Sequence, residues 1–215
     1  MEEKKIKSEN ANQIKNAFEV IQQLYQESAS LIRDIESQLN ENEHKFQLFS
    51  DGYCISSRTS IGLEPKEVNS WLCRKMAVAF VEESMVDLQK VDNTLTENLK
   101  LRNGLASCTK INENSKILYF RFILDDINQS EPQLIFGILY DIQFYKDWVK
   151  KRGNLLVAVE YEDDKLLAQF PDIDYENDTF KLKGKLKRVN LLDINSTEEL
   201  IEKVVIPAIQ LYEQQ

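Results

Sequence analysis

The sequence contains little glycine, proline, cysteine and histidine. Its 215 residues include 6 glycines, 4 prolines, 3 cysteines and 1 histidine. So few glycines and prolines leave little material for glycine-rich phosphate loops or proline-rich linkers. Histidine-ligated metal sites and acid–base catalysis by histidine would have to depend on His44 alone. We therefore expect one compact unit with no cofactor and no metal site.

The sequence also lacks a cysteine framework and a long apolar run. Cys54, Cys73 and Cys108 are an odd number, widely spaced and without a CxxC motif. This is typical of incidental thiols in a reducing compartment. The longest apolar runs, Met76–Val81 and Leu134–Tyr140, are far shorter than the roughly 20 residues that span a bilayer. We expect a cytoplasmic protein without a secretion signal or a membrane anchor.

The net charge of −9 disfavours nucleic acids and anionic lipid surfaces as partners. A basic run, KLKGKLKR at 181–188, could form a nucleic-acid surface with Trp148 as a stacking aromatic. Lysines on an edge strand, where they prevent aggregation, are the commoner explanation. A nucleic-acid partner is therefore not expected, and no membrane contact is expected either.

The strongest pattern lies near the start of the chain and predicts a long amphipathic helix within residues 1–45. Apolar residues follow one another at alternating steps of four and three, beside a second row spaced by seven. The predicted interaction face consists of Ile14, Phe18, Ile21, Leu24, Tyr25, Leu31, Ile32, Ile35 and Leu39. Ser28 completes the seam, and Ala17 begins the second row. Intramolecular packing and dimerisation explain this stripe equally well, so the helix is a possible oligomerisation element.

Residues 46–215 are expected to form an α+β domain that makes one compact unit with the helix. A loop and a short strand near Gly52–Ile61 come first. Pro65, Val68, Leu72 and Met76 then predict a buried helix that runs to Val81, although its tail could instead be a strand.

Three later segments alternate or are rich in β-branched and aromatic residues, which predicts strands: 116–125, 133–141 and 154–162. Between the second and third, Asp141 could cap a short helix carrying Phe144, Trp148 and Val149. Alternating acids and lysines predict a hairpin with Asn177 and Asp178 at its turn and Glu176 opposite Thr179.

A helix capped by Ser196 and Glu199 closes the chain, and Pro207 should kink it. The fold class that follows is α+β, with a mainly antiparallel sheet of about five strands from Lys116 to Leu192, between the terminal helices. The helices at the two ends of the chain should cover one face of that sheet.

The catalytic candidates are Asp141, Glu160, Glu162 and Lys165. Carboxylates on adjacent strands can hold Mg²⁺ for phosphodiester hydrolysis, with a lysine that stabilises charge. The pattern is loosely similar to that of PD-(D/E)xK nucleases. However, their Glu-x-Lys is absent, because Glu160 is followed by Tyr161 and Glu162. The alternative is a helix cap followed by a polar turn, so no family is assigned.

Two further patterns favour structural explanations. The acids at 172, 174, 176 and 178 resemble a calcium loop, but Asn177 and Lys183 occupy the positions of its glycine and glutamate. His44 with Cys54 could form a thiol nucleophile and its base, whereas a solvated loop histidine is the simpler expectation.

These observations favour a non-enzymatic protein-interaction or assembly protein, acting on a protein partner or a second copy through the N-terminal helix. A metal-dependent nuclease or phosphodiesterase using the acidic residues is the first alternative. A small-ligand-binding domain is the second.

Overall fold

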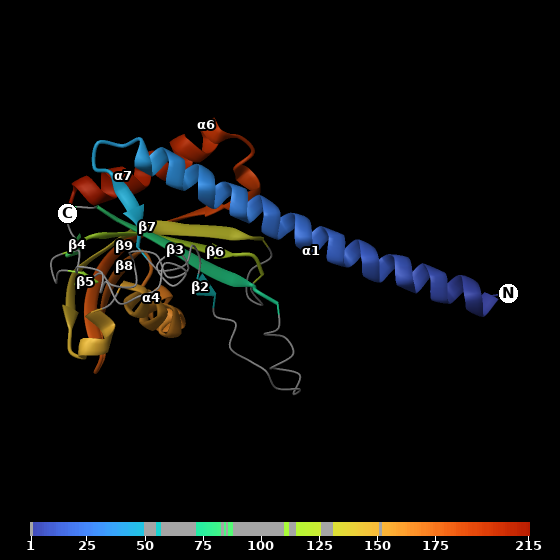
Figure 1. The fold of residues 1–215 in the computed structure, drawn as a ribbon, viewed down its shortest axis with the longest axis horizontal. Coiled ribbons are helices and arrows are strands. Elements are labelled where there is room, and N and C mark those ends of the chain that lie inside the picture. The colour runs from blue at the N-terminus through green and yellow to red at the C-terminus, as the bar shows by residue number, and fades with distance from the viewer. Residues whose placement is uncertain are drawn as a thin grey trace, which may run out of the picture.

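The computed structural model describes residues 2–49, 55–56, 72–82, 84, 86–87, 110–111, 115–125, 131–150 and 152–215. The fold is α+β, as predicted, with a long N-terminal helix, an antiparallel sheet and a helical C-terminus (Figure 1). None of the helices in these ranges is both long and apolar enough to cross a membrane. The predicted helix from Pro65 and the strand near Gly52–Ile61 lie mostly outside the described residues.

One antiparallel sheet organises the molecule. Six strands lie in the order β1-β3-β6-β7-β9-β8, and β2 also pairs with β3. Their bounds are Phe46–Leu48 (β1), Ile55–Ser56 (β2), Lys75–Glu82 (β3), Ile117–Ile123 (β6), Gln133–Phe144 (β7), Asp172–Glu176 (β8) and Phe180–Asn190 (β9). A separate pair joins β4 (Val86–Asp87) to β5 (Lys110–Ile111). The sheet thus begins well before Lys116, where the prediction had started it.

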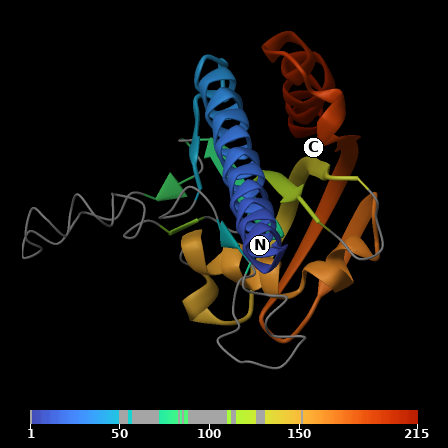
Figure 2. The same ribbon diagram turned by 90° about the vertical axis from the view of Figure 1, so that its right-hand side faces the viewer.

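Helices cover both faces of the sheet. On one face, the end of α1 (Glu2–Asn40) packs with the C-terminal helical segment, and the two run side by side in Figures 1 and 2. On the other face lie α4 (Arg152–Tyr161) and α5 (Asp163–Leu167). Alternation along the strands supplies both cores, as Val78 and Phe80 face α1 while Ala77 and Ala79 face α4. The predicted covering of one face by both ends of the chain is confirmed.

The C-terminal segment contains α6 (Thr197–Leu200), a π-helical turn (Ile201–Val205) and α7 (Ile206–Glu213). Ser196 caps its start by accepting from the backbone N–H of Glu199 at 3.2 Å, as predicted. The π-turn ends two residues before Pro207, whose ring nitrogen cannot donate to the preceding turn.

Two predicted elements have the wrong secondary structure. Residues 75–82, expected as the tail of a helix, form strand β3, which was the stated alternative. Residues 154–162, predicted as a strand, form most of helix α4. Leu155, Leu156, Ala158 and Val159 are buried there, and this spacing belongs to one helix face.

The helix cap predicted at Asp141 is also wrong. Strand β7 continues to Phe144 through an irregularity between Tyr140 and Gln143. Asp141 lies in that irregularity with a φ of 51°, and the short 3₁₀ turn begins only at Asp147. An extra residue in one strand re-aims the side chains around it, which explains the exposure of Asp141.

The predicted β8–β9 hairpin exists, but its register differs by two residues. Glu176 pairs with Lys181 and Asp174 with Lys183, so the turn centres on Asp178 and Thr179. Asn177 Oδ1 accepts from the backbone N–H groups of Thr179 and Phe180, which fixes this turn. A shift by two preserves the faces, so the acids still lie opposite lysines.

Candidate functional sites

The three predicted catalytic carboxylates take separate partners, and one of these partners is the fourth candidate, Lys165. Asp141 accepts from Lys183 at 2.9 Å on the exposed side of β7. Glu160 lies on α4 and forms a buried ion pair with Arg121 at 2.6 Å. Glu162 accepts from Lys165 at 2.7 Å at the start of α5. The premise of carboxylates on adjacent strands is therefore wrong for Glu160 and Glu162.

Glu160 belongs to a polar network inside the core between α4 and the sheet. Tyr119 donates to Glu160, and Arg121 donates to both. Burial, and after it the Glu160 charge, raises the pKa of Tyr119 well above its ordinary value, so the phenol keeps its proton. The Arg121 side chain is fully buried and that of Glu160 is 4% exposed, so the network is closed to a substrate.

Glu162 has a different environment at the edge of the same layer. Hydrogen bonds from Lys165, and then from the Tyr175 hydroxyl at 2.7 Å, lower the pKa of its carboxyl group. The Lys165 side chain is 70% exposed. The Tyr175 hydrogen bond therefore connects the start of α5 to β8, while the lysine remains in solvent.

The predicted interaction face of α1 divides into two halves. From Tyr25 onward it joins the fold, because the Tyr25 hydroxyl donates to the Cys73 carbonyl at 3.0 Å and Ile32, Ile35 and Leu39 are buried. Leu24 and Leu31 are partly buried, as is Ile21. Ile14 and Phe18, on the same stripe, are 61% and 66% exposed. Figure 1 shows why: the N-terminal half of α1 extends beyond the sheet.

A hollow lies against the middle of α1, between this helix and the start of α6. Its volume is about 490 Å³, and its lining includes Gln23, Glu27, Ser30 and Asn195. The small-ligand alternative stays a prediction, since these exposed polar groups indicate no particular ligand.

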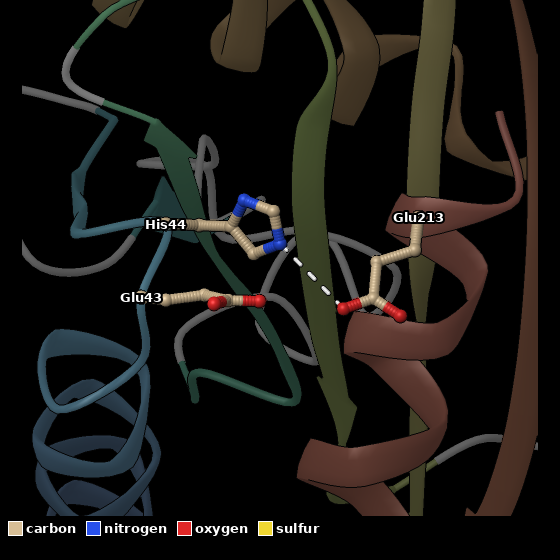
Figure 3. A group of neighbouring side chains, drawn as sticks. All are labelled: Glu43, His44 and Glu213. Atoms are coloured by element: carbon tan, nitrogen blue, oxygen red, sulfur yellow. Dashed lines mark ion pairs between the residues drawn. The ribbon is translucent and has the colours of Figure 1, made fainter.

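A second cluster surrounds His44, at the end of α1 that lies against the sheet. The side-chain ligand atoms of Glu43, His44 and Glu213 all lie within 4.8 Å of one another (Figure 3). His44 Nε2 lies 3.6 Å from the Glu213 carboxylate, and Nδ1 lies 3.9 Å from that of Glu82. One imidazole is thus surrounded by three carboxylates.

The fold determines where each member of this cluster lies. Asn42 Oδ1 accepts from the His44 backbone N–H at 3.0 Å, which shapes the turn after α1. Phe46 of β1 pairs with Glu82 of β3, so the ladder brings that carboxylate beside the turn. Glu213 comes from the last turn of α7.

Aromatic rings hold the imidazole in place. His44 lies 5.6 Å from the Phe46 ring and 5.3 Å from that of Tyr212. Tyr212 also donates to Glu82 at 2.6 Å. Burial, and then this hydrogen bond, raises the pKa of Tyr212 above its ordinary value. Because 75% of the His44 side chain is covered, with 25% exposed, the expectation of a solvated loop histidine is wrong. Cys54, its predicted partner, lies outside the described residues.

Comparison with protein-family models, with curated proteins and with solved structures finds no match for this chain.

Proposed function

We propose that this chain is a cytoplasmic interaction and assembly protein, and that the projecting half of α1 pairs with the same segment of a second copy. The observation that supports this proposal is that one continuous apolar stripe is buried in one half of α1 and exposed in the other. Its later part packs inside the fold at Ile32 and Ile35, while its earlier part, Ile14 and Phe18, is exposed. Exposed apolar stripes of helical periodicity are typical of helix–helix association.

A second copy is favoured by the charge of the segment. Although the chain carries a net charge of −9, residues 10–26 contain only Lys15 and Glu19 as charged residues. These two form an ion pair at 3.5 Å within one helix. Two such segments can therefore approach without net repulsion, and the apolar stripe supplies the attraction.

An antiparallel arrangement suits the shape of the chain. The sheet and its helices are attached at the C-terminal half of α1, so parallel pairing would bring two acidic bodies together (Figure 1). Antiparallel pairing places them at opposite ends of the paired helices, which lowers their repulsion.

Light scattering after size exclusion tests this proposal across a concentration series. We expect the wild type to form dimers and the Ile14→Glu, Phe18→Glu variant to be monomeric. The matched control is Gln13→Glu, Asn16→Glu, which adds the same charge at exposed positions off the stripe and should leave the dimer intact. A wild type that is monomeric throughout, or a dimer that persists in the stripe variant, overturns the proposal.

A further inference from the structure

We propose that Glu43, His44 and Glu213 bind a divalent transition-metal ion of the zinc type, which joins the end of α1 to the last turn of α7. The inference is independent of helix pairing, because the cluster lies at the other end of α1 from Ile14 and Phe18. It rests on three features of the cluster: the donor set, the spacing of the donor atoms and the surroundings of His44.

The donor set fits a zinc-type ion. Zinc is bound by imidazole nitrogen and carboxylate oxygen at about 2.0–2.2 Å, which places tetrahedral ligand atoms about 3.4 Å apart. His44 Nε2 and Glu213 Oε1 are 3.6 Å apart. A carboxylate oxygen of Glu43 lies within 4.8 Å of a ligand atom of each of these two residues. Glu43 and Glu213 are both exposed, so a small rotation of their side chains can bring the three ligand atoms to the tetrahedral spacing. Three protein ligands leave a fourth position for water.

The imidazole nitrogen that faces this space has no hydrogen bond within the described part of the chain. His44 Nε2 is also shielded from solvent. A shielded nitrogen without a hydrogen bond is costly, and a metal ion supplies the electron acceptor that its lone pair lacks. The opposite nitrogen, Nδ1, lies 3.9 Å from the Glu82 carboxylate, which is longer than a hydrogen bond. A shorter contact there would complete the carboxylate–histidine–metal arrangement that orients ligand histidines.

Charge supports the same conclusion. Among the described residues, neither Glu43 nor Glu213 nor Glu82 forms an ion pair with lysine or arginine. Three carboxylates close to one imidazole repel one another, and a divalent cation bound by Glu43 and Glu213 lowers that repulsion. Glu82 keeps its place because Tyr212 and Ser84 donate to it.

Titration calorimetry with zinc sulfate, on full-length chain stripped with a chelator, tests the site. We expect one zinc ion per chain, bound by the wild type and by Glu41→Gln, an exposed glutamate of the same turn that is absent from the cluster. Binding should be lost in His44→Gln and in Glu213→Gln. In Glu82→Gln it should weaken by about 10–100-fold, the usual effect of losing a carboxylate behind a ligand histidine.

Cobalt and thermal unfolding provide two independent readouts. Bound Co²⁺ should give visible absorption bands that disappear in Glu213→Gln, and zinc should raise the Tm of the wild type but not that of this variant. Glu213 is half exposed, so this variant keeps its fold even if His44→Gln does not. The absence of saturable one-to-one binding overturns the inference. Binding that survives in Glu213→Gln overturns it too, because it would come from other groups, such as the three cysteines.

Discussion

Arg121 and Glu160 place a charged pair inside the layer between the sheet and α4. Removing one partner of such a pair costs about 3–5 kcal/mol, because the remaining charge stays buried. Glu160→Leu should therefore lower the free energy of unfolding by about that amount, measured by urea denaturation. The Arg121→Met, Glu160→Leu double variant should recover most of the loss, since it leaves no buried charge. A double variant as unstable as the single one would mean that packing, and not charge, explains the cost.

The Glu162 carboxyl group gives a pH dependence with a definite sign. Its pKa is lowered from an ordinary value of 4.5 by hydrogen bonds from Lys165 and Tyr175. A lowered pKa in the folded state adds stability that is present above the ordinary value and is lost as the pH falls through the folded-state pKa.

The difference in unfolding free energy between wild type and Glu162→Gln should accordingly be largest at neutral pH and should shrink towards zero at acidic pH. Urea denaturation of both proteins, at pH 7 and at about one pH unit below the ordinary value, measures it. A difference that is the same at both pH values would exclude the carboxylate charge as its source. Because Lys165 is mostly exposed, solvent screening keeps the effect small.

The His44 cluster shows what a sequence cannot reveal at the level of residues. His44 and Glu43 are neighbours in the chain, but Glu82 and Glu213 reach them only through the β1–β3 ladder and the docking of α7. No spacing in the sequence indicates that these four residues lie close together. The sequence shows that any histidine ligand must be His44, but the burial of its side chain depends on the Phe46 and Tyr212 rings.

Within α1, truncating an apolar residue of the stripe should cost much stability in the packed half and little in the exposed half. Ile35 is fully buried and Ile14 is 61% exposed. Ile35→Ala should lower the free energy of unfolding by about 2–5 kcal/mol through lost burial and a cavity. Ile14→Ala should change it by less than about 0.5 kcal/mol when the chain is monomeric. Urea denaturation at low concentration compares them, and equal costs would mean that the N-terminal half packs on the fold.

The elements that the sequence predicted well carry a clear period, cap or composition. The α1 stripe follows from its spacing, the C-terminal helix from its cap, and strands β6 and β7 from their β-branched and aromatic residues. The errors concern short apolar runs, for which period does not distinguish strand from helix. Met76–Val81 is buried throughout, as a central strand requires, whereas Leu155–Val159 carries valines that favour strands yet has one buried helical face.

At the scale of the whole molecule, the long helix α1 separates the two candidate sites, the exposed apolar stripe and the His44 cluster. Its 39 residues span about 58 Å at 1.5 Å per residue. The exposed stripe lies towards one end of the helix, and the His44 cluster follows the other. Zinc and a partner helix therefore touch different parts of the chain, so loss of one should leave the other unchanged.

Salt dependence distinguishes apolar pairing of α1 from assembly through charge. The paired segments are nearly neutral, whereas each chain carries a net charge of −9. Added salt screens the repulsion between the two acidic bodies and leaves the apolar attraction in place. The dimer dissociation constant should therefore stay constant or fall between low and high sodium chloride, measured by analytical ultracentrifugation. Assembly through opposite charges predicts weakening instead, so a dissociation constant that rises steeply with salt would contradict pairing through Ile14 and Phe18.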